Sequence, residues 1–171
     1  MKAIAMRPVG TLIFVAVLGL AWAATEIQSQ EQSGESEAKV VDLSSARRVI
    51  AAAERKAMEI EVPMNIAIVD IGGNLKAFGR MDGAFLGSID ISINKAFTAR
   101  AFNTDSGNLA ALSQSGGPLF GIHASNQGRI VIFAGGIPLR DESGEVIGAV
   151  GVSGGSVEED QAVAEAGVAA F

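Results

Sequence analysis

The chain has 171 residues, which is enough for one domain of ordinary size but not for two separate cores. Hydrophobic residues make up 49% of it, too many for a disordered chain. It contains no cysteine, so disulfides, thiolate catalysis and cysteine-bound metal sites are excluded. The formal net charge is −6 and no run of Lys and Arg offsets it, so nucleic acid is not an expected partner.

The N-terminus has the three parts of a cleavable signal peptide. Residues 1–8 carry two basic and no acidic side chains, residues 9–20 are almost entirely apolar, and Ala21-Trp22-Ala23 has the small-residue pattern of a cleavage site. The apolar run is shorter than the about 20 residues that span a bilayer, although an uncleaved anchor is the alternative interpretation. We therefore expect residues 1–23 to be removed, leaving a periplasmic or secreted protein of net charge −8 without membrane attachment.

A polar, acidic segment over residues 24–41 follows, with the run TEIQSQEQSGESEAK and no periodicity. That composition is typical of a flexible linker. Residues 42–171 are expected to form one domain. Its first helix has Ser44 as the candidate N-cap and Pro63 as the stop, because apolar residues recur at helical spacing between them.

A β-hairpin is expected next, with strands at residues 64–70 and 75–80 around a Gly-Gly-Asn turn. A helix over residues 88–102 and a short helical turn near residues 108–113 follow. Three further strands are expected, at residues 129–134, 137–140 and 146–152.

Two features near the C-terminus bear on packing. Gly148 and Gly151 leave the last strand without side chains at these positions, so a helix or a flat ligand is expected to approach its backbone closely. The final helix opens at Ser156, with Glu159 three residues later, which is the pattern of a capping box. The element order predicts an α/β protein of the α+β type, an antiparallel sheet with helices packed against it.

The helix at 88–102 has apolar residues on two faces, whereas a helix that buries a single stripe needs only one. One face carries Ile89, Ile93, Ala96, Phe97 and Arg100, and the other carries Ile91, Lys95, Thr98 and Phe102. The second face is therefore expected to meet a ligand or another subunit. The alternative is that the helix lies at the centre of the core.

Few residues carry a chemical signal. His123 is the only histidine and lies in a Gly-flanked loop, where it is a candidate ligand or acid–base group, although a lone histidine is often incidental. Lys95 is either desolvated and reactive or placed at a subunit interface with its stem buried. Glu158, Glu159 and Asp160 resemble a metal patch, but their position in the first turn of a helix already accounts for them.

Seven segments in order resemble the GlcG/HbpS-like family of small haem-binding, haem-degrading proteins, from about residue 42 to residue 171. They are Ile66–Asp70, Gly72–Asn74, Arg80–Ala84, Asn94–Ala99, Gly121–Asn126, Gly135–Leu139 and Gly151–Gly155. The resemblance implies profilin-like α/β/α layers around a five-stranded antiparallel sheet, and it implies homo-oligomers.

The resemblance also implies that haem or a related tetrapyrrole is the ligand, and that the role is accessory or sensory rather than catalytic. The iron ligand it implies is either Thr98 or His123. Haem needs apolar walls and a cationic rim. The residues expected to contact haem are Thr98, His123, Lys95, Phe102, Met81 and Arg80. Other candidate walls and anchors are Phe97, Phe120, Gly151, Arg100 and Arg129.

Two alternative functions remain. One is a small oligomeric enzyme that acts on a small organic acid or on haem itself, using Lys95 or His123. The other is an oligomeric protein-interaction module without a small ligand. The sequence has no convincing acid–base pair, which weighs against the enzyme.

Overall fold

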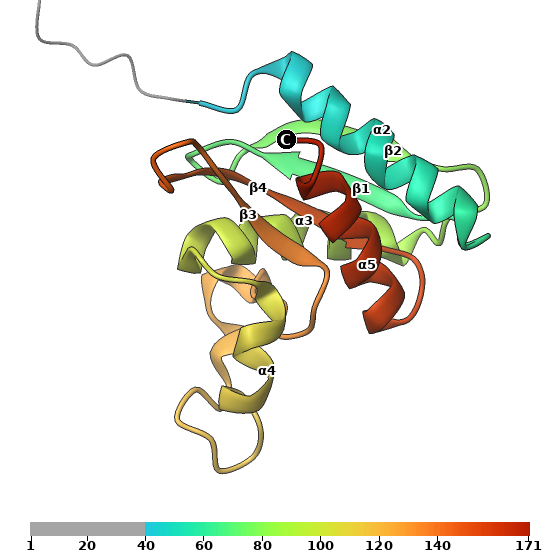
Figure 1. The fold of residues 1–171 in the computed structure, drawn as a ribbon. Coiled ribbons are helices and arrows are strands. Elements are labelled where there is room, and N and C mark those ends of the chain that lie inside the picture. Colours follow the sequence, from blue (N-terminus) through green and yellow to red (C-terminus); the bar gives the residue numbers. More distant parts are fainter. Residues whose placement is uncertain (1–39) are drawn as a thin grey trace, which may run out of the picture. The chain divides into compact units, whose positions relative to one another are not determined.

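The computed structural model of the chain describes residues 40–171 (Figure 1). The expected signal peptide at 1–23 and most of the expected linker lie outside the described residues. Val41, which we expected in the linker, is only 1% exposed and packs in the hydrophobic core. Within residues 40–171, no helix has the length and apolarity needed to cross a membrane.

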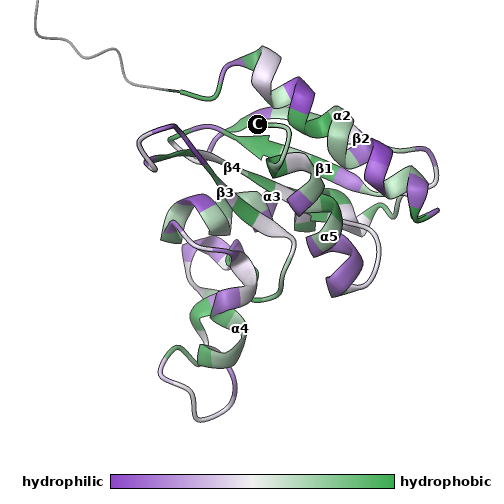
Figure 2. Ribbon diagram, viewed as in Figure 1, coloured by the Kyte–Doolittle hydropathy of each residue, from purple (hydrophilic) through white to green (hydrophobic). Residues whose placement is uncertain are grey.

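The first described helix, α2 (Leu43–Glu59), begins two residues earlier than predicted. Asp42 is its N-cap instead of Ser44, because an Asp42 carboxylate oxygen accepts a hydrogen bond from the Ser45 backbone N–H at 2.7 Å. Ser44 only donates its hydroxyl to the same carboxylate, at 2.7 Å. Hydrophilic and hydrophobic residues alternate along α2 in Figure 2, as expected for a helix with one buried face.

The predicted hairpin is present as β1 (Asn65–Val69) and β2 (Leu75–Arg80), which pair antiparallel. Asp70 holds the turn, because its Oδ1 accepts hydrogen bonds from the backbone N–H groups of Gly72 and Asn74 at 2.9 Å each. The second long helix, α3 (Gly87–Phe102), also matches its predicted range closely.

An extension over residues 103–135 leads from α3 back to the sheet and carries only short helices. These are η1 (Ser106–Asn108), α4 (Leu109–Leu112), η2 (Ile122–Ala124) and η3 (Asn126–Gly128). In Figure 1 α4 lies well away from the strands. The chain then forms β3 (Gly136–Arg140), β4 (Val146–Ser153) and α5 (Val157–Val168). The capping box of Ser156 and Glu159 is present as predicted.

Within residues 40–171 the sheet has four antiparallel strands in the order β2-β1-β4-β3, not the five that we expected. The missing strand is the one predicted at 129–134, which has no regular secondary structure. Its apolar run made it look like a buried strand, but its backbone groups bond to side chains instead of to a neighbouring strand. Val131 N–H donates to the Thr98 hydroxyl at 3.0 Å, and the Phe133 carbonyl accepts from the Ser106 hydroxyl at 2.8 Å.

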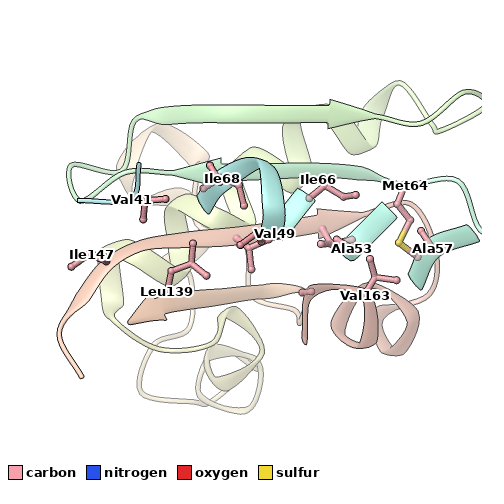
Figure 3. Packing of buried hydrophobic residues seen from close by; sticks show 14 residues of the cluster. Val41, Val49, Ala53, Ala57, Met64, Ile66, Ile68, Leu139, Ile147 and Val163 are labelled. Atoms are coloured by element: carbon pink, nitrogen blue, oxygen red, sulfur yellow. The ribbon is translucent and has the colours of Figure 1, made fainter. Parts of the chain in front are cut away.

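Helices cover both faces of the sheet. On one face α2 and α5 pack on each other and on the strands, around the main core cluster. Figure 3 shows Val49, Ile66, Ile68 and Val163 of this cluster gathered between the helices and the sheet. On the other face α3 packs against β1 and β4 around a smaller cluster of mostly alanine side chains.

Gly151 explains how closely α3 approaches β4. A Cβ at Gly151 would collide with the Ser92 carbonyl and the Ala96 amide of α3. The expected close approach to the last strand is therefore confirmed, and the element that approaches Gly151 is a helix.

Candidate functional site

A cavity of about 450 Å³ lies between α3, the η2 loop and the irregular segment that follows η3. Its lining residues are Asp90, Ile91, Asn94, His123, Gly128, Ile130, Val131, Ile132 and Phe133. Aliphatic and aromatic side chains therefore form most of the wall, and a few polar groups converge on it, as is usual for small-molecule sites. Of the six residues expected to contact haem, the structure places His123 in this lining.

His123 lies in η2, on a turn that begins at Gly121, where φ is +87°. Its side chain is exposed, and within residues 40–171 its imidazole makes no hydrogen bond or ion pair. An imidazole nitrogen without a protein partner can accept a metal ion or exchange a proton with a ligand. His123 is thus the available donor at the edge of an apolar cavity.

Thr98, the other candidate iron ligand, lies behind this wall and is fully buried. Its hydroxyl donates to the Asn94 carbonyl at 2.7 Å, and it accepts from the Val131 N–H at 3.0 Å. Both capacities of the hydroxyl are therefore used within the fold. In this structure Thr98 joins α3 to the segment that forms the cavity wall.

Lys95 is also fully buried, and its ammonium group forms an ion pair with Asp160 Oδ2 at 2.5 Å. It donates to the Val152 carbonyl at 2.9 Å, while the other carboxylate oxygen of Asp160 accepts from the Gly154 and Gly155 N–H groups. Burial lowers the pKa of Lys95 and raises the pKa of Asp160, and the hydrogen bond between them opposes both shifts. The pair connects α3, β4 and α5.

The remaining three expected residues lie apart from the cavity lining. Phe102 is at the C-terminal end of α3 and is 40% exposed. Met81 packs against the main core cluster, and its sulfur accepts a hydrogen bond from the Met64 N–H at 3.4 Å. Arg80 donates to the Ala84 carbonyl at 3.2 Å. The structure therefore does not bring these side chains together with His123.

Sequence reasoning missed a polar chain beside the cavity. Asn94, which is 8% exposed, donates its amide N–H to Asp90 Oδ2 at 2.9 Å and accepts from Arg129 Nε at 3.3 Å. The Arg129 guanidinium stacks on the Phe97 ring, with 3.6 Å between its central carbon and the ring centroid. The spacing of Asp90 and Asn94, four residues apart on one helix face, was the available signal.

These contacts also fix the cavity wall. Three side chains of α3, Asn94, Phe97 and Thr98, contact the chain at Arg129 and Val131. They replace the ladder hydrogen bonds that a strand would have supplied. Within residues 40–171 no cluster of three or more His, Asp or Glu side chains could hold a metal ion.

Comparison with known proteins agrees with this architecture. A 15.0 kDa protein from the dhaT–dhaS intergenic region of Citrobacter freundii is 46% identical over 131 residues, which are 77% of this chain and 92% of that protein. The corrinoid adenosyltransferase PduO of Citrobacter freundii is 41% identical over 120 residues, 70% of this chain. The match covers only 36% of PduO, so the chain spans about a third of that enzyme.

Among solved structures, that of a PduOC–haem complex superposes with a TM-score of 0.74 and 35% identity, covering 77% of this chain and 94% of that one. The family model described as haem degrading protein HbpS-like matches residues 41–169. That match takes in nearly the whole part of the chain that the structure describes, from the first core residue to the end of α5. The chain belongs to the HbpS-like family.

Proposed function

We propose that this protein is exported and binds haem or a related tetrapyrrole, in an accessory or sensory role without turnover of its own. The observation that carries the proposal is the His123 imidazole at the edge of an apolar cavity, which has no partner among residues 40–171, in a chain that resembles a protein solved with haem. The adenosyltransferase activity of PduO is not part of the proposal, because this chain corresponds to only a third of that enzyme.

The residues present fit a flat apolar ligand that carries a metal. Ile91, Ile130 and Phe133 supply apolar wall, and His123 supplies an imidazole nitrogen of the kind that holds haem iron in many proteins. The Thr98 hydroxyl is engaged with Asn94 and Val131, so His123 is the better candidate to bind the iron. Bound haem would supply the redox-active iron, and the chain would supply the nitrogen donor and the apolar wall.

A haemin titration of the full chain, followed at the Soret band, tests the proposal. We expect saturable binding at micromolar affinity or tighter, which corresponds to about −8 kcal/mol. His123→Gly should shift the Soret maximum and weaken binding, and added imidazole should restore the wild-type spectrum. Ser125→Ala, two residues away in the same exposed loop, is the matched control and should bind like wild type. A wild-type protein without a saturable spectral change would refute haem binding.

The absence of turnover needs a separate measurement. The groups that line the cavity include one imidazole and one carboxylate, Asp90, and the Asp90 carboxylate is hydrogen-bonded to Asn94. We therefore expect the Soret band of the complex to persist when a reductant and oxygen are supplied. Steady loss of the band with release of iron would favour the alternative, an enzyme that degrades haem.

The proposal also includes export of the protein and its assembly into a homo-oligomer. N-terminal sequencing of the secreted protein should find a start at or near Ala24, and a chain that begins at Met1 and sediments with membranes would indicate an anchor. We also propose a homo-oligomer, because Phe120 and Phe133 are 67% and 38% exposed beside the cavity and its loop. Large exposed aromatic side chains are typical of interfaces.

A further inference from the structure

Arg129 stands at the point where the cavity wall begins. Its neighbours in sequence, Gly128 and Ile130, both line the cavity, and so does its hydrogen-bond partner Asn94. The guanidinium plane lies on the Phe97 ring, with its central carbon 3.6 Å from the ring centroid. Stacking on one face and one hydrogen bond through Nε hold the group in a fixed orientation before any ligand is present.

The two terminal nitrogens of Arg129 remain available. Within residues 40–171 neither makes a hydrogen bond, and no carboxylate lies within ion-pair distance of the group. Asp90 is the acidic residue of the cavity lining, but Asn94 stands between Asp90 and Arg129 and bonds to both. The side chain is half-buried, and its Nε bond to Asn94 places the guanidinium next to a residue of the cavity lining.

We infer that Arg129 binds a carboxylate group of the molecule that occupies the cavity. A guanidinium whose face is stacked and whose Nε is bonded has an oriented pair of N–H groups left, and this pair matches the two oxygens of a carboxylate. The inference rests on the proposed function, because haem carries two carboxylates. It narrows the ligand class to a flat apolar molecule with an acidic edge.

The other two arginines considered as anchors are less suited. Arg80 donates a terminal N–H to the Ala84 carbonyl, and Arg100 donates one to Asn103 Oδ1 at 2.7 Å. Neither of them donates to a residue of the cavity lining, whereas Arg129, which is not itself in the lining, donates to Asn94, which is. Arg129 therefore combines a direct contact with the lining and unused terminal donors.

The test compares haemin with its dimethyl ester, which lacks the carboxylates but keeps the ring and the iron. Both are titrated into the full-length protein. We expect wild type to bind haemin about tenfold more tightly than the ester, the effect typical of a hydrogen bond to a charged group. The overall negative charge of the protein acts in the opposite direction, so a preference for the acid would reflect a local contact.

Three variants isolate the residue. Arg129→Gln should remove the preference for haemin over the ester. Because the variant also loses the contacts of Arg129 with Asn94 and Phe97, the ratio of the two affinities is the readout, and it should fall to about one. Arg129→Lys keeps the charge but not the paired donors and should give an intermediate preference. Arg55→Gln, which removes the same charge from an exposed position on α2, is the matched control and should behave like wild type.

The outcomes separate the inference from the proposed function. Equal binding of haemin and ester by wild type, with no effect of Arg129→Gln, would overturn the role of Arg129 while haem binding stands. If wild type binds neither compound, the proposal of haem binding is refuted. Carboxylate binding by Arg129 is then tested separately, with succinate as the probe. A succinate-dependent shift of the Arg129 Nε–H signal in an NMR spectrum supports the inference, and no shift overturns it.

Discussion

The buried pair of Lys95 and Asp160 offers the sharpest test of how α3 is held against the rest of the domain. The Lys95 side chain is 0% exposed and the Asp160 side chain 4% exposed. Replacing Lys95 with Met preserves most of the buried volume but leaves Asp160 Oδ2 without its partner, while Oδ1 keeps the two backbone N–H groups at 3.0 Å. Removing one member of a buried pair costs about 3–5 kcal/mol.

That loss is a large share of the roughly 5–15 kcal/mol by which domains are stable. For a urea dependence of about 2 kcal/mol per molar, the unfolding midpoint of Lys95→Met should fall by about 2 M. Lys56→Met is the control, because Lys56 forms an exposed pair with Glu59 at 3.2 Å, and exposed pairs contribute about 1 kcal/mol or less.

The loss in free energy of unfolding caused by Lys95→Met should depend on pH. Burial already raises the pKa of Asp160 above its ordinary value of 3.8, and loss of the neighbouring ammonium raises this pKa further. The folded variant then keeps a proton at pH values where the unfolded chain has lost it, so its free energy of unfolding decreases as pH rises above 3.8. The variant should be closest to wild type in acid and furthest from it above the raised pKa.

Urea unfolding of wild type, Lys95→Met and Lys95→Met/Asp160→Asn at several pH values measures both effects. In the double variant the carboxylate is gone, so part of the stability should return and the added pH dependence should disappear. The argument that an uncompensated charge is left in the core would be refuted by either of two results. One is that Lys95→Met lowers the free energy of unfolding by less than about 1 kcal/mol, and the other is that the loss does not change with pH.

Three other changes test separate parts of the fold. Gly151→Ala should cost about 1–3 kcal/mol in urea unfolding, because its methyl group meets the Ser92 carbonyl, whereas Gly87→Ala has open space and should change stability little. The N-cap hydrogen bonds, chiefly that from the Ser45 backbone N–H, lower the pKa of Asp42 to about 2. The ionised Asp42 therefore stabilises the fold above pH 3.8, and this stabilisation is lost as the pH falls toward 2. Asp42→Asn should not lose stability in that window when thermal midpoints are compared. Phe102→Glu should lower the mass measured by light scattering if the exposed end of α3 is a subunit contact, and a monomeric wild type would contradict this.

The elements that were predicted correctly are set by residues close to one another along the chain. The hairpin turn, the range of α3 and the capping box of α5 each depend on residues within a few positions of one another, and all are present. The N-cap of α2 shows the limit even at short range. Asp42 and Ser44 are both good capping residues two positions apart, and only the hydrogen bond from the Ser45 N–H distinguishes them.

The contacts that the sequence did not predict join residues that are far apart along the chain. Lys95 was expected to be either reactive or at an interface, and its actual partner lies 65 positions away on α5. The same limit applies to Thr98, whose contact with Val131 joins segments 33 positions apart. The types of these residues were compatible with several roles, and only the topology of the sheet brings each pair together.

The strand that is missing and the cavity that is present have one physical origin. Had residues 129–134 extended the sheet, their amide groups would have bonded to a strand, and the Thr98 and Ser106 hydroxyls would have lost the partners that they have in this structure. Instead the segment leaves the sheet and lies over α3, where side chains hold it at intervals. The space between these points of attachment is lined by the same apolar side chains that made the run resemble a buried strand. A continuous apolar run in a chain with this topology therefore predicts a cavity wall as readily as a strand. The buried hydroxyls that face the run, Thr98 on α3 and Ser106 on η1, are the feature that separates the two.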